Sequence, residues 1–315
     1  MFGKSRQAFH QMETRQTRVV VNNEVLLVYI KEIRKQQPRL GTRKMYDILQ
    51  DTMTANGIKI GRDKFFSVLG ENELLVKKRR KHVKTTDSNH AYKRYRNLIK
   101  DYIPTGPEQI WASDITYLSA DTDCGFVYLS LVTDMYSKKI MGYHVHPTLE
   151  TNGPLEALTM ALKNRMHPES RLIHHSDHGV QYCCKEYINV LESNQIQISM
   201  SARGNPYENA SAERVNGILK SEYYLDRYFS SLAEVRFVVK DTVTIYNELR
   251  PHASCDYLTP EVAHTHNGVL KKRWKNIKKE KKPKELEPIT EEVKFAIAQL
   301  LKKENKKNYV EVTSP

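Results

Sequence analysis

The chain has 315 residues, of which 28% are charged and 9% are aromatic, a globular balance with room for two or three domains. Its 50 Lys and Arg against 37 Asp and Glu leave a net charge of +13, which favours a polyanionic partner, either nucleic acid or an anionic membrane surface. No apolar run approaches the roughly 18 residues of a membrane span, and the first seven residues lack a signal peptide's apolar core, so we expect a nucleic-acid partner, no membrane and a cytoplasmic location.

Residues 1–76 are predicted to form a helical, basic region. Apolar residues recur at helical spacing over 22–37, 41–57 and 61–75. Three short helices with glycine-containing turns are typical of a helix-turn-helix DNA-binding unit, in which Arg43 and Lys44 are candidate DNA contacts. An ordinary helical bundle with solvated charges stays open as the alternative.

A basic linker is predicted over 77–104. Its first eight residues, 77–84, include six Lys or Arg. Such a run is usually solvated and encodes no base specificity. Beside a DNA-binding unit it would instead contact phosphates, through Lys77, Lys78, Arg79 and Arg80.

Residues 105–268 are predicted to form an α/β domain. Strands are expected over 109–119, 125–137, 138–147, 171–177 and 196–201, and helices over 152–165, 185–195 and 209–220. Three strands joined by turns, followed by alternating helix and strand, predict a mixed five-stranded sheet with flanking helices. The fold class is therefore α/β, preceded by an all-α region.

The C-terminal residues, 269–315, are rich in lysine. Residues 271–284 include nine basic residues among fourteen, and 291–308 could form one amphipathic helix. A solvated tail is the default interpretation, and a phosphate-binding arm is the alternative.

The cysteines indicate neither a disulfide framework nor a clear zinc site. A chain of this length has only four: Cys124, Cys183, Cys184 and Cys255. His174 and His175 lie near Cys183 and Cys184, but adjacent pairs are poor zinc ligands because structural sites usually separate paired ligands by two to four residues. Buried thiols and strand-end histidines are the favoured interpretation.

The predicted helix over 209–220 has one polar edge. At 3.6 residues per turn, the side chains on it share an arc of about 60°: Asn209, Glu213, Asn216 and Lys220. Val215, Ile218 and Leu219 point elsewhere and supply the core-facing stripe.

Three carboxylates interrupt this pattern at positions that suggest a common site. Asp114 lies within a strand whose aromatic and β-branched neighbours place it near the centre of the sheet, where a charge is costly unless paired or metal-bound. Asp177 ends a strand just before a glycine, and Glu213 lies on the polar edge. Singly, each has an ordinary explanation: a turn cap, a helix start, or a solvated helix carboxylate.

Together, these carboxylates predict a metal site. Between Asp177 and Glu213 lie 35 residues of helix, strand and turn, which would return Glu213 to the side of the sheet that Asp177 faces. Three oxygen ligands would then converge on Mg²⁺ or Mn²⁺. Two ions about 4 Å apart would activate an attacking oxygen and stabilise the leaving one at a phosphate, with Asn209, Asn216 and Lys220 contacting DNA or orienting metal-bound groups. Asp134 competes as a ligand.

Five segments resemble the integrase-core transposases encoded by the second reading frame of IS3-type bacterial insertion sequences. They are 111–118 (WASDITYL), 174–182 (HHSDHGVQY), 205–222 (NPYENASAERVNGILKSE), 246–252 (YNELRPH, which contains Arg250) and 258–264 (LTPEVAH). The resemblance covers residues 2–267. It implies a ribonuclease-H-like fold and an Asp-Asp-Glu triad at Asp114, Asp177 and Glu213. Arg250 is a further candidate DNA contact.

The resemblance also implies a reaction and its partners. Such enzymes cut one strand at each transposon end and use the freed 3′-hydroxyl to attack another phosphodiester. We expect double-stranded DNA as partner, at terminal repeats and target, a homo-oligomer on that DNA, fusion to an upstream-frame product, and a nucleoid-associated location in the bacterial cytoplasm. A non-catalytic DNA-binding regulator and a ribonuclease-H-like nuclease without strand transfer stay open.

Overall fold

A computed structural model describes residues 6–76, 93, 95–100, 102–123, 125–201 and 210–273. All of them belong to one unit with bounds Met1–Trp274. Several predicted features lie outside the described residues: Lys77, Lys78, Arg79, Arg80, Asn209, Cys124, much of the linker 77–104 and the tail from residue 274 onward. Within the described ranges, no helix has both the length and the apolar character needed to cross a lipid bilayer.

The N-terminal region is helical, as predicted, but its helices differ from the predicted ones. The helices are α1 (Arg6–Gln36), α2 (Thr42–Ile48), α3 (Gln50–Ala55) and α4 (Arg62–Glu71). The long α1 begins well before the predicted start, and the second predicted helix divides into α2 and α3 at Leu49. Leu26 and Ile30 of α1 pack with Met45 and Phe65, so only the second half of α1 contributes to this small core.

A five-stranded mixed sheet forms the centre of the larger region, which confirms the predicted α/β class. Its strands are β1 (Ile110–Ser119), β2 (Phe126–Asp134), β3 (Ile140–His146), β4 (Ile173–Ser176) and β5 (Gln197–Met200). The order is β3-β2-β1-β4-β5. β1, β2 and β3 pair antiparallel, as hairpin-linked strands do, whereas β4 and β5 add in parallel after helical connections.

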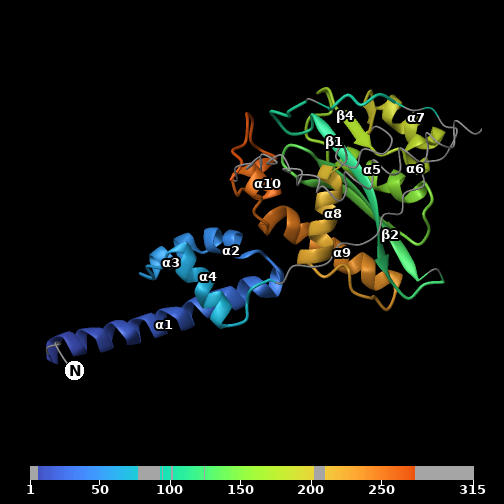
Figure 1. Cartoon of the computed structure of the whole chain (residues 1–315). Helices are drawn as coiled ribbons and strands as arrows, with labels where there is room; N and C mark the ends of the chain where they lie inside the picture. The colour runs from blue at the N-terminus through green and yellow to red at the C-terminus, as the bar shows by residue number, and fades with distance from the viewer. Residues whose placement is uncertain are drawn as a thin grey trace, which may run out of the picture. The chain divides into compact units, whose positions relative to one another are not determined.

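Helices cover both faces of this sheet (Figure 1). One core joins Leu118, Leu129 and Val145 of the sheet to α8 (Ala210–Glu222) and α9 (Leu232–Leu249). The opposite core joins Trp111 and Val132 to α5 (Asn152–Lys163), α6 (Val180–Cys183) and α7 (Lys185–Ser193). Successive residues of a strand face opposite sides, so β1 contributes to both cores.

Helix α5 approaches the sheet unusually closely at β3. A Cβ atom on Gly142 would lie 2.0 Å from a carbonyl oxygen of α5 and 2.6 Å from one of its backbone nitrogens. Only glycine therefore fits at this point of β3.

A short C-terminal segment follows α9. It contains the 3₁₀ turn η1 (Ala253–Cys255) and α10 (Pro260–Ala263). His264, at the end of α10, is buried between two carboxylates, 3.5 Å from Glu108 and 3.8 Å from Asp134. This buried polar cluster ties the segment to the edge of the sheet where β1 begins.

Candidate active site

Asp114 lies in the middle of β1 and faces α8. It is paired with Leu131 of β2, whereas the pairing of β1 with β4 ends at Ala112. Asn216 of α8 donates a hydrogen bond from Nδ2 to Asp114 Oδ2 at 2.8 Å. The predicted strand and the predicted polar helix edge therefore meet at this carboxylate.

The electrostatics of Asp114 are unusual for an aspartate. Burial is the largest cause of a pKa raised to about 7, and the negative charges of Asp177 and Glu213 raise it further, against the hydrogen bond from Asn216. Because each of these carboxylates affects the ionisation of Asp114, the three charges lie in one neighbourhood.

Asp177 follows directly after the last residue of β4. Gly179 donates its backbone N–H to Asp177 Oδ1 at 2.9 Å, and a Cβ on Gly179 would lie 3.0 Å from that same oxygen. The glycine predicted to end the strand therefore lets the chain turn tightly around the carboxylate. Asp177 consequently lies at the carboxyl end of a parallel strand, as predicted.

Glu213 lies on the first turn of α8 and is exposed to solvent. Val215, Ile218 and Leu219 are buried in the core, as predicted. The described residues contain no group of three or more His, Cys, Asp or Glu side chains arranged to hold one metal ion. The three acids are electrostatic neighbours, but the convergence predicted from the sequence is not seen as a formed ligand set.

Lys220 completes the described part of the polar edge. Its Nζ lies 5.2 Å from the centroid of the Tyr117 ring, also on β1. Burial lowers the pKa of Lys220, and attraction to Asp114 opposes that change. One edge of α8 thus presents a carboxylate, an amide and an ammonium toward the stretch of β1 that carries Asp114.

Comparison with known proteins identifies the family. Residues 104–206 and 194–260 each match a family described as integrase core domain. The chain is 33% identical over 265 residues to an uncharacterised 31 kDa protein of insertion element IS600 from Shigella sonnei, covering 82% of this chain and 94% of that protein. It is 34% identical over 215 residues to transposase InsF of insertion sequence IS3A from Escherichia coli K12. This match covers 68% of this chain and 74% of InsF.

The chain belongs to the integrase-core transposases of IS3-type insertion sequences. It is a DNA transposase, and its enzyme class is that of the DDE-type polynucleotidyl transferases. The mixed five-stranded sheet with flanking helices is the architecture predicted from the sequence.

Two solved structures have weaker similarity to this chain. The HTLV-2 integrase catalytic core is 18% identical, with a TM-score of 0.39, and covers 50% of this chain and 97% of that one. The catalytic domain of Mos1 mariner transposase is 16% identical, with a TM-score of 0.36. The match covers 44% of this chain and 70% of that one.

Three of the residues predicted to contact DNA make polar contacts within the protein. Arg250 is 2% exposed, and its guanidinium donates two hydrogen bonds of 2.8 Å to the carboxylate of Glu222. Lys44 lies 3.3 Å from the same carboxylate, and burial together with Arg250 lowers its pKa to about 8. Asn216 is buried against Asp114. Their polar groups serve contacts within the protein, whereas Arg43 is exposed.

Asp134, the competing ligand, has a structural role. It is fully buried, and its carboxylate accepts hydrogen bonds from the backbone N–H groups of Glu108, Tyr136 and Ser137 and from the Ser137 hydroxyl. These bonds hold the turn after β2, so Asp134 is excluded from the candidate site. The sequence already favoured Asp114 over Asp134, because aromatic and β-branched neighbours on both sides place Asp114 more firmly within the sheet.

The cysteines and the histidines of the alternative zinc site are buried, as the favoured interpretation of the sequence expected. Cys183 and Cys184 are buried thiols, and the Cys184 Sγ points to a backbone carbonyl oxygen. His174 Nε2 contacts two hydroxyl groups, those of Ser113 and Tyr187. Burial lowers the pKa of His174 to about 3, so its imidazole is neutral.

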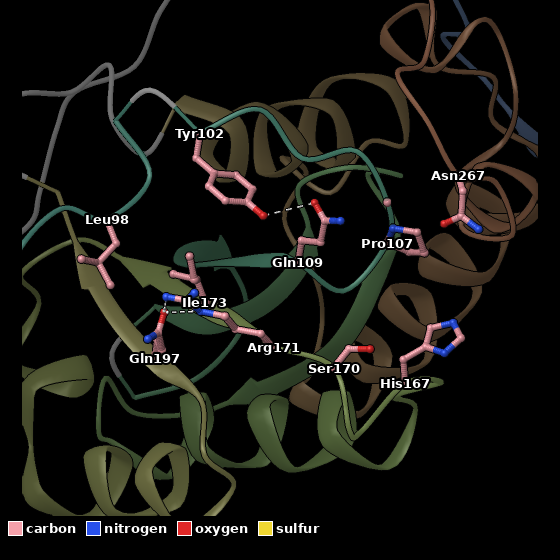
Figure 2. A pocket seen from close by; sticks show the side chains of 11 residues that line it. Leu98, Tyr102, Pro107, Gln109, His167, Ser170, Arg171, Ile173, Gln197 and Asn267 are labelled. Atoms are coloured by element: carbon pink, nitrogen blue, oxygen red, sulfur yellow. Dashed lines mark hydrogen bonds between the residues drawn. The ribbon is translucent and has the colours of Figure 1, made fainter.

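A separate cavity of about 650 Å³ lies at the other end of the parallel strands (Figure 2). Its lining includes Gln109, Ile173 and Gln197, which stand at the amino ends of β1, β4 and β5. Asp177 lies at the carboxyl end of β4, so this cavity is remote from the candidate site. None of the residues predicted to act in catalysis lines it.

Two residues near the site were missed from the sequence. Tyr182 lies in the segment 174–182 that carried the family resemblance, but no role was assigned to it. Glu222 ends α8 and holds Arg250 and Lys44. No local pattern identifies either residue, because their importance depends on partners distant in the chain.

Proposed function

We propose that this transposase cuts a phosphodiester bond at each end of its element and joins the freed 3′-hydroxyl to a second phosphodiester. The proposal is carried by one observation: the partly buried Asp114 of the central strand accepts a 2.8 Å hydrogen bond from Asn216 of α8, and burial together with the charges of Asp177 and Glu213 raises its pKa to about 7. In a chain with a net charge of +13, such a local concentration of negative charge is the arrangement that a cation-dependent phosphoryl-transfer site needs.

The donor atoms near this site fit a hard divalent cation. Asp114, Asp177 and Glu213 offer carboxylate oxygens, the ligand type that Mg²⁺ and Mn²⁺ prefer. The buried Asn216 Oδ1 has no hydrogen-bond partner among the described residues, so the site also holds an unsatisfied oxygen. We propose that the three carboxylates hold two such ions, which would supply the positive charge that activates the attacking oxygen and stabilises the leaving one.

The chain's own residues would prepare this site for DNA. Asn216 orients the Asp114 carboxylate through the 2.8 Å hydrogen bond. Lys220, held on the same helix edge, would contact a phosphate close to the carboxylates. We retain as proposed DNA contacts Arg43, Asn209, Lys77, Lys78, Arg79 and Arg80.

The proposed partners follow from this reaction. The substrates are double-stranded DNA, at the terminal repeats and at the target. Because two ends must be brought together, we propose a homo-oligomer on the DNA. An upstream-frame product, joined by fusion, is the proposed second protein component.

The test compares wild type with Asp177→Asn on terminal-repeat DNA, with and without Mg²⁺. Asp121→Asn is the matched control, because Asp121 is an exposed carboxylate in the turn after β1. We expect wild type and Asp121→Asn to nick and join strands, and Asp177→Asn to bind DNA without either product. Binding alone by wild type would favour the regulator, and hydrolysis without joining would favour the nuclease.

A further inference from the structure

Tyr182 lies beside the candidate site without a role in the reaction described above. It belongs to the one-turn helix α6, which begins three residues after Asp177. Its ring packs edge-on against Tyr187 of α7, with the ring centroids 5.4 Å apart and the planes at 79°. Both side chains are buried in the core between α5, α6, α7 and the sheet.

The two hydroxyl groups of this tyrosine pair differ in their hydrogen bonds. The Tyr187 hydroxyl lies 2.9 Å from His174 Nε2, in a polar contact that also includes the Ser113 hydroxyl. The Tyr182 hydroxyl is equally buried, but it has no hydrogen-bond partner among the described residues. Because a buried unsatisfied hydroxyl costs free energy, a phenylalanine would suit a purely structural role better at this position.

The surroundings of the Tyr182 hydroxyl show where a partner would come from. After burial and the neighbouring Tyr187, the negative charges of Asp114 and Asp177 are the next causes that raise the pKa of Tyr182. The phenol therefore keeps its proton and can act only as a donor toward these carboxylates. A Cβ atom on Gly179 would lie 3.0 Å from Asp177 Oδ1 and 3.6 Å from Cδ2 of the Tyr182 ring, so the carboxylate and the ring flank the same turn of the backbone. The hydroxyl oxygen itself is buried.

We propose that Tyr182 is a positioning residue whose hydroxyl donates a hydrogen bond to the Asp177 carboxylate when the carboxylates of the site hold their divalent cation. This inference rests on the proposed function of the site. Carboxylates that bind metals generally accept hydrogen bonds from neighbouring donors that do not touch the metal. Loss of such a donor weakens metal affinity or activity about 10-fold to 100-fold. Asn216 supplies one such donor from α8, and Tyr182 would supply another from α6.

The experiment compares Tyr182→Phe with Tyr187→Phe, each of which removes one buried hydroxyl from the same ring pair. The thermal midpoint is measured for the full chain without divalent ions and during titration with Mn²⁺. We expect Tyr182→Phe to keep or raise the midpoint without metal and to need about 10-fold to 100-fold more Mn²⁺ for its stabilisation. Tyr187→Phe should lower the midpoint without metal and respond to Mn²⁺ as wild type does.

DNA affinity and nicking distinguish this inference from the proposed function. Terminal-repeat DNA should bind Tyr182→Phe with wild-type affinity, and its nicking rate at limiting Mn²⁺ should fall while saturating Mn²⁺ restores most of it. Wild-type Mn²⁺ affinity in Tyr182→Phe would overturn this inference alone, provided that Asp177→Asn still abolishes nicking. If wild type shows no Mn²⁺ stabilisation, or if Asp177→Asn still nicks DNA, the proposed function fails and this inference fails with it.

Discussion

The substitution Asp114→Asn should make the protein more stable while removing its activity. Asparagine matches aspartate in shape, and its side-chain oxygen can still accept the hydrogen bond from Asn216. What the substitution removes is the negative charge that the folded protein holds in a partly buried position near Asp177 and Glu213. At neutral and higher pH, the folded chain should therefore gain free energy relative to wild type.

The magnitude follows from the pKa of Asp114, about 7 in the folded chain against 3.8 for an ordinary aspartate. At ~1.36 kcal/mol per pH unit, the largest possible gain in unfolding free energy is about 4 kcal/mol. Because Asp114 is partly exposed to solvent, we expect a gain of roughly 2–3 kcal/mol. Since the folded pKa is raised, the stability contributed by protonated Asp114 is complete below pH 3.8 and disappears as pH rises through about 7. The advantage of Asp114→Asn should therefore grow between about pH 4 and pH 7 and then level off.

Urea unfolding followed by tryptophan fluorescence provides the assay. Trp111 is fully buried on the same strand as Asp114, so its emission reports unfolding of the central sheet. The chain has two tryptophans, and a Trp274→Phe background leaves Trp111 as the single reporter. The free energy of unfolding would be measured without divalent ions at several pH values from 4 to 8.

Asp121→Asn provides the control, because it removes an exposed carboxylate. The difference in unfolding free energy between this variant and wild type should be nearly independent of pH. If the curves for Asp114→Asn and wild type run parallel from pH 4 to pH 8, Asp114 has an ordinary pKa. The charge cluster that supports the proposed function would then be absent.

Two further substitutions test the packing around the site by urea unfolding. Glu222→Gln should cost about 3 kcal/mol because it leaves the buried Arg250 cation without its carboxylate, whereas Glu261→Gln, in a more exposed ion pair, should cost less than about 1 kcal/mol. Equal losses in these two variants would contradict the buried-pair interpretation. Gly142→Ala should cost at least about 2 kcal/mol, since its Cβ would lie 2.0 Å from a carbonyl oxygen of α5, and Gly217→Ala, with no atom within 4 Å, should be neutral or stabilising. A tolerated Gly142→Ala would mean that α5 and β3 are farther apart.

Most of the architecture around the site could be predicted from local patterns. Aromatic and β-branched neighbours placed Asp114 in a strand, a glycine marked the end of the strand before Asp177, and helical spacing separated the polar edge of α8 from its buried stripe. Such patterns are visible in sequence because burial repeats with the period of the helix or strand. They also favoured buried thiols over zinc, which the structure supports for Cys183 and Cys184.

Charge alone does not reveal which basic and acidic side chains have partners inside the protein. Arg250 and Lys44 were assigned to DNA as basic residues, but both serve the carboxylate of Glu222. Asp134 is the weaker competitor of Asp114 by sequence context, and the turn after β2 engages its carboxylate in hydrogen bonds. In each case the deciding partner is a group whose position depends on how the chain folds back on itself.

The sequence by itself determined the family, the mixed sheet and the faces on which the acidic side chains stand, because these depend on residue type and on short-range periodicity. Only the tertiary structure decided that Asn216 would reach Asp114, 102 positions away along the chain, and that the Tyr182 hydroxyl would be buried near two carboxylates without a partner. The physical reason is that hydrogen bonding and desolvation act over a few ångströms, and the packing of helices on the sheet determines which distant groups come within that range.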